Sequence, residues 1–253
     1  MTEIPNVLAC DVGNSAVHLA HVRGDEVSSA QVVPVGELGH LADRLEALWS
    51  QVPAPRKLVA ASVNAPALKA LEAATAQDVL VIGRDLPLPI ETDLPEPDAI
   101  GVDRLCCAVA AYDRLGTACV VADFGTAITV DCVDDGGVFR GGAILPGLKL
   151  LAESLHTGTA QLPRVQPRRP DWVFGKNTEQ AMVGGIIAAA RGAMRELIEA
   201  YATELGRWPT VILTGGDAEV ICPRVGDDGL VQAVVADLAL RGVALAYYNS
   251  LLR

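Results

Sequence analysis

The stretch from Val120 to Asp131 reads VVADFGTAITVD, and the expected fold follows from it. An apolar strand runs into a turn that carries Asp123, Gly125 and Thr126, and a second strand then begins. Such a turn suits ionic ligands, because a carboxylate binds a cation or water, glycine lets the backbone approach a phosphate, and threonine donates a hydrogen bond. Taken alone, the same pattern is also typical of a structural hairpin turn.

A second copy of this pattern occurs earlier in the chain, with Asp11 placed 112 positions before Asp123. Residues 7–19 read VLACDVGNSAVHL, so an apolar strand again ends in an Asp-x-Gly turn, followed by small polar residues and another strand. The repeat indicates two related halves, each of which places one loop at a shared cleft. We therefore predict that both loops face one polyanion, a nucleoside triphosphate with its metal ion.

The composition favours an α/β protein with an aliphatic core. Of the 253 residues 51% are hydrophobic but only 4% are aromatic, so the core must consist mainly of Val, Leu, Ile and Ala. Valine-rich runs alternate with longer Ala/Leu-rich segments, as in α/β folds. We expect an N-terminal lobe over residues 1–112 with the first loop, and a C-terminal lobe over residues 113–253 with the second loop. The apolar helices of the second lobe, above all the one at 230–252, could pack within the subunit or contact a second subunit.

Charge and cysteine usage exclude several classes of function. The net charge of −11 disfavours a nucleic-acid-binding surface, and the short basic segment 164–169 is interpreted as a solvated loop. The six cysteines have no metal-site spacing and lie mostly in apolar runs, which indicates buried free thiols in a reducing cytoplasm. The N-terminus lacks the basic region of a secretory signal, and no apolar run reaches the roughly 18 to 20 residues of a membrane span. We expect a cytoplasmic protein without nucleic-acid or membrane partners.

The periodicity of apolar residues predicts the order of elements. The first half is expected to be β-β-α-β-α-β, with strand–turn–strand at 6–23, helices at 36–51 and 66–76, and strands at 57–63 and 79–82. The second half is expected to continue with helices at 105–115, 148–155, 177–205 and 230–252 and strands at 120–131, 138–144 and 210–213.

Gly101-Val102-Asp103-Arg104 follows the irregular, proline-rich segment 86–100 and leads into a helix. An acid and a base stand there side by side at a helix N-terminus, where the helix dipole favours anions. Two interpretations remain open: the pair contacts a ligand, or Asp103 stabilises the start of the helix with Arg104 as its surface partner. Thr178 has the same ambiguity between a helix cap and a ligand donor.

Six blocks, taken together, resemble the type III pantothenate kinase family. They are DVGNS at 11–15, GVDR at 101–104, DFGTAIT at 123–129, GGAILPG at 141–147, GKNT at 175–178 and TGG at 214–216. The resemblance implies the actin-like ATPase fold, in which two duplicated lobes of ribonuclease-H-like topology surround a nucleotide cleft. It also implies a homodimer that phosphorylates pantothenate, the first step of coenzyme A biosynthesis, with ATP, Mg²⁺ and a monovalent cation, K⁺ or NH₄⁺.

The resemblance also implies roles for individual residues. Asp103 matches the general base that takes the proton from the pantothenate hydroxyl, Asp123 matches the monovalent-cation ligand, and Asp11 would lie near Mg²⁺. The expected pantothenate contacts are Gly101, Val102, Asp103, Arg104 and Thr178. The expected ATP contacts are Asp11, Val12, Gly13, Asn14, Ser15, Ala16, Val17, His18 and Thr126.

Two positions depart from the family pattern. Many members have tyrosine where this chain has Leu94, and some have lysine where it has His18. Because that tyrosine lines the pantothenate pocket, Leu94 leaves open a related kinase with a different acceptor, and a non-catalytic nucleotide-binding regulatory homologue is a further alternative. Retention of Asp11, Asp103 and Asp123 together favours an enzyme.

Overall fold

The computed structural model describes residues 4–226 and 229–252, and the chain divides into two compact units. The first unit comprises Met1–Arg114 and Asp237–Arg253, and the second comprises Leu115–Ala236. The expected lobe boundary placed residues 237–253 in the second lobe, whereas the structure groups them with the first unit. The reason is that the last helix, α7 (Leu238–Ser250), buries its apolar face against the first sheet.

The sheet of the first unit has the strand order β3-β2-β1-β4-β5. β1 and β3 each pair antiparallel with β2, whereas β4 pairs parallel with both β1 and β5. The strands of this sheet are β1 (Asn6–Val12), β2 (Ala16–Arg23), β3 (Glu26–Pro34), β4 (Arg56–Ser62) and β5 (Val79–Val81), and the short strand β6 (Glu91–Thr92) is not part of it. The helices are η1 (Val35–His40), α1 (Leu41–Gln51), α2 (Ala65–Ala73), η2 (Pro97–Ala99), α3 (Val102–Leu115) and α7.

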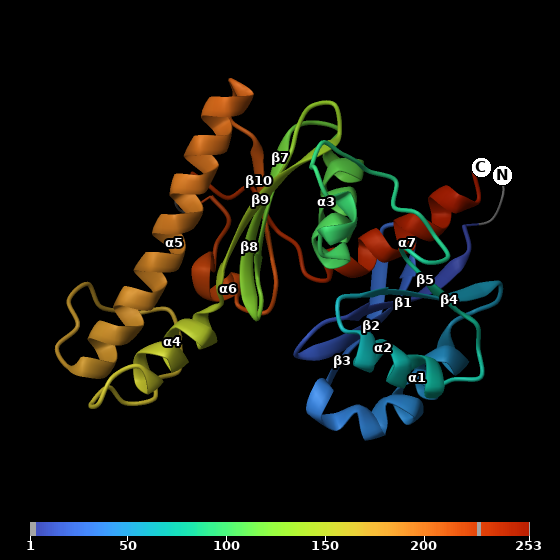
Figure 1. Ribbon diagram of the computed structural model, residues 1–253, viewed down its shortest axis with the longest axis horizontal. Coiled ribbons are helices and arrows are strands. Elements are labelled where there is room, and N and C mark those ends of the chain that lie inside the picture. The colour runs from blue at the N-terminus through green and yellow to red at the C-terminus, as the bar shows by residue number, and fades with distance from the viewer. Residues whose placement is uncertain (1–3, 227–228, 253) are drawn as a thin grey trace. The chain divides into compact units, whose positions relative to one another are not determined.

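The central strand β1 is covered on both faces, which explains its continuous apolar sequence. Val7 and Ala9 pack with side chains of α7, whereas Leu8, Cys10 and Val12 pack with the buried leucines of α1 and α2. Figure 1 shows α7 beside β1 and β4. This double cover fixes the carboxyl end of β1, from which the first phosphate turn begins.

The sequence-based prediction missed β3. Most of its side chains are exposed, because β3 is an edge strand, and its sequence includes Ser28, Ser29 and Gln31. A polar edge strand has no alternation of apolar and polar residues, so periodicity gives no signal for it. The helix expected over 36–51 is correct only from Leu41, since a 3₁₀ turn occupies Val35–His40.

The second unit repeats the topology of the first. Its strands lie in the order β11-β10-β7-β8-β9, which is the order of the first unit read from β5 to β3. Here too the first three strands are antiparallel neighbours, and the later strands pair parallel. The elements are β7 (Cys119–Phe124), β8 (Ala127–Val133), β9 (Val138–Pro146), α4 (Leu148–Thr157), α5 (Thr178–Leu205), β10 (Thr210–Thr214), α6 (Ala218–Ile221) and β11 (Ala233–Val234). The structure thus confirms the internal repeat.

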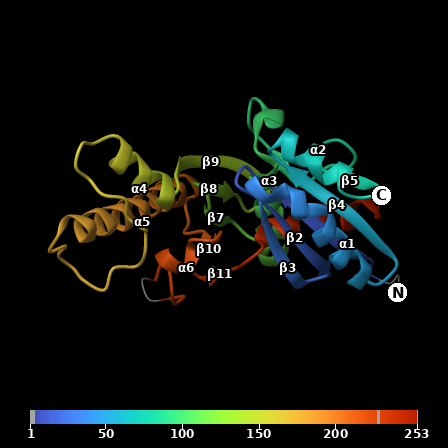
Figure 2. The same ribbon diagram turned by 90° about the horizontal axis from the view of Figure 1, so that it is seen from below.

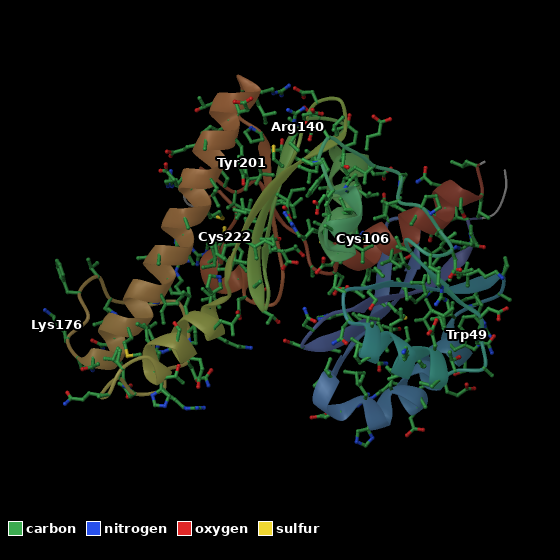
Figure 3. All side chains as sticks on the ribbon, in the orientation of Figure 1. Trp49, Cys106, Arg140, Lys176, Tyr201 and Cys222 are labelled. Atoms are coloured by element: carbon green, nitrogen blue, oxygen red, sulfur yellow. The ribbon has the colours of Figure 1, made fainter. Side chains whose placement is uncertain are left out.

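Helices α4 and α5 cover one face of the second sheet, as Figures 1 and 2 show from two sides. Phe124 and Ile128 meet Met194 and Ile198 in this core. The Tyr201 hydroxyl of α5 donates to Val130 O at 3.1 Å, and Figure 3 labels this side chain between the helix and the sheet. The predicted bounds of α5 are confirmed within one residue at its start.

The final helix begins later than expected. β11 and a turn occupy part of the predicted helix 230–252, and α7 begins at Leu238. Gly242 lies so close to α3 that a Cβ there would overlap the backbone of Cys106. Within the described residues, no helix is both long and apolar enough to cross a membrane.

Candidate active site

The first phosphate turn joins β1 to β2 and is closed by its own backbone. Gly13 N donates to Ala16 O at 3.0 Å, and a Cβ at Gly13 would lie only 3.2 Å from that same oxygen. Asn14 and Ser15 at the tip of the turn are exposed. A glycine turn with exposed short polar residues is the arrangement that anion binding by backbone N–H groups requires.

Asn64 anchors this turn, and the sequence analysis missed it. Asn64 Oδ1 accepts from Ala67 N at 3.1 Å and caps α2, while Asn64 Nδ2 donates to Gly13 O at 3.3 Å. One side chain therefore ties the turn to the start of a helix. The sequence does carry a helix-capping signal here, because Asn64 stands two residues before Pro66. Its contact with Gly13, however, joins residues that are 51 positions apart in the sequence.

Asp11 and His18 lie opposite each other on β1 and β2, at the base of the turn. Both side chains are half-buried. Burial lowers the pKa of His18 below its ordinary value, and the carboxylate of Asp237 opposes this shift. At neutral pH His18 is therefore a neutral imidazole, which can donate one hydrogen bond to a phosphate but does not supply the positive charge of a lysine.

The second block places Asp103 in the first turn of α3. Its Oδ1 accepts from Arg104 N at 2.8 Å, and this is the one hydrogen bond of that carboxylate within the described ranges. A Cβ at Gly101 would lie 2.6 Å from Asp103 Oδ1 and 3.7 Å from Val63 Cγ1. Only glycine at position 101 therefore leaves room for the carboxylate in this orientation, and Oδ2 remains able to accept a proton.

Asp11 and Asp103 both lie near the buried side chain of Cys106 in the first unit. The buried thiol of Cys106, labelled on α3 in Figure 3, lies one turn after Asp103. Burial raises the pKa of Cys106 well above its usual range, and the nearby charges of Asp11 and Asp103 raise it further. Cys106 is thus an inert thiol that lies near both carboxylates.

The second phosphate turn, between β7 and β8, is built like the first. Gly125 N donates to Ala127 O at 3.1 Å, which corresponds to the bond between Gly13 and Ala16. Phe124 O accepts from Asp217 N at 2.9 Å, just as Val12 O accepts from Val63 N at 3.1 Å in the first unit. A Cβ at Gly147 would overlap Gly125 O and Thr126 O. The turn is therefore held by its own backbone and by the backbone of the residues just before α4 and α6.

Polar side chains gather on the face of the second sheet that carries Asp123. In the strand register Asp123 stands between Thr129 of β8 and Thr214 of β10, on the face opposite the core of α4 and α5. Asp131 lies on the same face, two residues after Thr129 on β8, and is only 2% exposed. Its strand partner is Gly142 of β9, where the Cβ of any other residue would overlap Asp131 Oδ1. Two carboxylates and two hydroxyls on one face favour a cation there.

The described residues contain no group of three or more His, Cys, Asp or Glu side chains that could hold a metal ion. A cation at Asp11 or Asp123 would need further oxygen ligands from hydroxyl groups, carbonyl groups, water or phosphates. That donor set is typical of Mg²⁺ bound with a nucleotide, which uses one or two carboxylates plus substrate phosphates.

Thr178 begins α5, and its side chain is exposed. Asn177 is the residue that caps the helix, because its Oδ1 accepts from Gln180 N at 2.9 Å. A Cβ at Gly175 would overlap the first turn of α5, so the preceding segment lies flat against the helix. Figure 3 shows Lys176 at the outer end of α5, away from β7 and β8. Thr178 thus keeps a hydroxyl that the helix cap does not use.

The predicted site residues are divided between the two units. Residues 11–18 and 101–104 belong to the first unit, and Asp123, Thr126 and Thr178 belong to the second. Each unit places its Asp-x-Gly turn at the carboxyl end of its central strand.

The family profile described as "Type III pantothenate kinase" matches residues 7–200. This chain belongs to that family. Three similar proteins, each named type III pantothenate kinase, come from Akkermansia muciniphila, Rhodospirillum rubrum and Brevibacillus brevis. The first two are 39% and 41% identical over 64% and 66% of this chain, and the matches span 66% and 65% of those relatives. The third is 32% identical over 95% of this chain and 98% of the relative.

Solved structures show the fold. A protein described as a Baf family transcriptional activator from Campylobacter jejuni has a TM-score of 0.64 at 19% identity, over 97% of this chain and 100% of that one. An activator of 2-hydroxyisocaproyl-CoA dehydratase from Clostridium difficile, with bound ADPNP, has a TM-score of 0.53 at 12% identity, over 98% and 96%. With the duplicated topology described above, these likenesses confirm the actin-like ATPase fold.

Proposed function

We propose that this protein transfers the γ-phosphoryl group of ATP to the hydroxyl of pantothenate, giving phosphopantothenate and ADP. The observation that carries the proposal is the position of Asp103, whose carboxylate lies over Gly101 with Oδ1 bonded to Arg104 N. Oδ2 is then the atom that receives a proton. A carboxylate placed to orient a hydroxyl supplies most of what phosphoryl transfer needs from a side chain.

In the proposed reaction the pantothenate oxygen forms a bond to the γ-phosphorus as its proton moves to Asp103 Oδ2. The bond from the γ-phosphorus to the β,γ-bridging oxygen breaks, and ADP leaves with that electron pair. Arg104 and Thr178 hold pantothenate. The turn over residues 11–18, together with Thr126, holds the triphosphate through backbone N–H groups and short side chains.

We assign the cation sites from the chemistry of their donors. Asp11 would hold Mg²⁺ together with phosphate oxygens, which fits a single carboxylate at the end of β1. Asp123 would hold K⁺ or NH₄⁺, which fits the hydroxyl-bearing neighbours Thr129 and Thr214 in the strand register. When bound, these cations offset the negative charge of the triphosphate.

We further propose a homodimer that acts in the cytoplasm. In the segment that precedes α5, Val173 and Phe174 are 89% and 73% exposed, an apolar pair that a second subunit would cover. The apolar face of α7 is buried within its own unit, which is the intramolecular packing that the sequence left open beside a dimer contact. All six cysteines are free thiols, as expected for a reducing compartment.

A coupled assay of ADP release with purified protein, ATP, Mg²⁺ and K⁺, with and without pantothenate, tests the activity. Asp103→Asn should keep ATP binding while turnover falls by about 10²- to 10⁴-fold, the usual effect of losing a general base. Asp113→Asn is a matched control, because Asp113 is an exposed acid near the other end of α3. If Asp103→Asn kept turnover near that of wild type, Asp103 would not be the general base and would only stabilise the start of α3.

The same assay separates the competing acceptors. Leu94, half-buried in the segment before Gly101, is where the chain departs from the family pattern, so the assay is repeated with other small hydroxyl compounds in place of pantothenate. ATP binding without stimulation by pantothenate would redirect the proposal to another small hydroxyl compound or to a regulatory role.

A further inference from the structure

Gly215 follows β10 and lies directly against the carboxylate of Asp123. Its φ angle is +91°, in the region that favours glycine. A Cβ at this position would overlap Asp123 Oδ1 and would lie 2.6 Å from both the carbonyl carbon and the oxygen of Phe124. No other residue type fits this position without moving the second phosphate turn.

The backbone on either side fixes Gly215 in this place. Thr214, the residue before it, is paired with Asp123 in the parallel register of β10 and β7. Two residues after it, Asp217 N donates to Phe124 O at 2.9 Å. Gly215 is thus held between two connections to β7, and it forms a wall against which the Asp123 carboxylate rests.

The next residue provides a contrast within the same turn. A Cβ at Gly216 would meet no atom within 4 Å, and the φ angle of Gly216 is not in the left-handed region. Of two adjacent glycines, one therefore contacts the carboxylate and the other does not.

The orientation of a ligating carboxylate affects which ion binds. Monovalent cations of different size are discriminated by the size of the oxygen cage and by the number of its ligands. Residues that orient a ligand without touching the ion commonly change metal affinity when they are replaced.

We propose that Gly215 is a positioning residue that fixes the Asp123 carboxylate and thereby sets both the affinity and the selectivity of the second turn for monovalent cations. This inference rests on the proposed role of Asp123 as the cation ligand.

The test compares wild type with Gly215→Ala, Gly216→Ala and Asp123→Asn. Thermal unfolding is followed with a saturating non-hydrolysable ATP analogue while K⁺ replaces an inert organic cation at constant ionic strength, and the same titration is repeated with Na⁺ and NH₄⁺. In Gly215→Ala the K⁺ concentration that gives half of the stabilisation should rise by about 10-fold or more, and the preference among the three ions should change. Gly216→Ala should keep the wild-type midpoint and the wild-type order of ions.

Asp123→Glu provides a second approach if Gly215→Ala does not fold. Glutamate keeps the charge, but its side chain is one methylene longer, so its carboxylate cannot take the position that aspartate has against Gly215. The stabilisation by K⁺ should therefore be lost. A midpoint of Gly215→Ala within twofold of wild type with an unchanged order of ions, or wild-type K⁺ stabilisation in Asp123→Glu, would overturn the inference. Wild type without any K⁺ effect, or Asp123→Asn with a full effect, would instead refute the cation role of Asp123.

Discussion

Replacing Gly101 by alanine should impair turnover without harming the fold. The new Cβ would lie 2.6 Å from Asp103 Oδ1, and ordinary contacts begin near 3.4 Å, so the oxygen must move by about 0.8 Å. That shift disrupts the hydrogen bond of 2.8 Å that Asp103 Oδ1 accepts from Arg104 N. Misplacement of a catalytic group by about 1 Å costs up to about 10²-fold, so we expect kcat for ADP release to fall roughly 10- to 100-fold.

Stability should change little in the same variant. The φ angle of Gly101 is not in the left-handed region, so alanine suits the backbone there. Restriction of the unfolded chain by alanine would contribute about 0.4–1 kcal/mol of stabilisation, against the cost of moving one carboxylate. Gly39→Ala is the control, because a Cβ at Gly39 meets nothing within 4 Å.

A double mutant shows whether Gly101 acts through Asp103. In an Asp103→Asn background the Gly101→Ala change should have a much smaller effect on kcat than in wild type, because the group it displaces no longer accepts the proton. If Gly101→Ala keeps kcat within twofold of wild type, or if the two effects multiply fully, the reasoning from the carboxylate position is refuted.

Three further predictions concern stability and the first phosphate turn. Gly242→Ala places a Cβ 2.5 Å from the carbonyl carbon of Cys106, so urea unfolding should show a loss of about 1–3 kcal/mol, and an unchanged midpoint would contradict this packing. Asn64→Ala should lose about 1 kcal/mol with the α2 cap and should raise KM for ATP, whereas Asn64→Ser should restore stability but not KM; equal KM values for wild type and both variants would exclude the anchoring role. Burial lowers the pKa of His21 below the ordinary 6.5. As the pH decreases, His21 is therefore protonated in the unfolded chain at a higher pH than in the folded chain. The free energy of unfolding should therefore be highest above pH 6.5 and fall as the pH decreases, and His21→Gln should flatten this slope in urea titrations; an identical slope would show that His21 does not contribute.

The sequence was most informative where local pattern and burial agree. The two Asp-x-Gly turns were predictable because each follows a strand buried on both faces, whose apolar run ends abruptly at a polar turn. Helix α5 was predictable because Asn177 is a capping residue and apolar residues at helical spacing run from there to Leu205, and in the structure Asn177 does cap the helix. Each of these signals lies within a few residues of the element that it defines.

Features that depend on distant contacts could not be predicted in this way. The edge strand β3 has no buried face to impose alternation, so it resembled a loop. Gly101 and Gly215 belong to two of the family blocks in the sequence, but only the folded chain shows that each leaves space beside a carboxylate of the candidate site. The contact between Asn64 and Gly13 joins residues 51 positions apart, which no local pattern reports.

The return of α7 to the first unit has a consequence for synthesis on the ribosome. Leu240, Val243 and Ala244 complete the core that Val7 and Val59 begin, so the first unit is assembled from both ends of the chain. The second unit, in contrast, is one continuous segment, Leu115–Ala236. During translation the second unit can therefore complete its core first, while one face of the N-terminal sheet stays uncovered until the last helix emerges. Ribosome-bound chains that stop before Leu238 would expose this face to chaperones, although they already carry both phosphate turns.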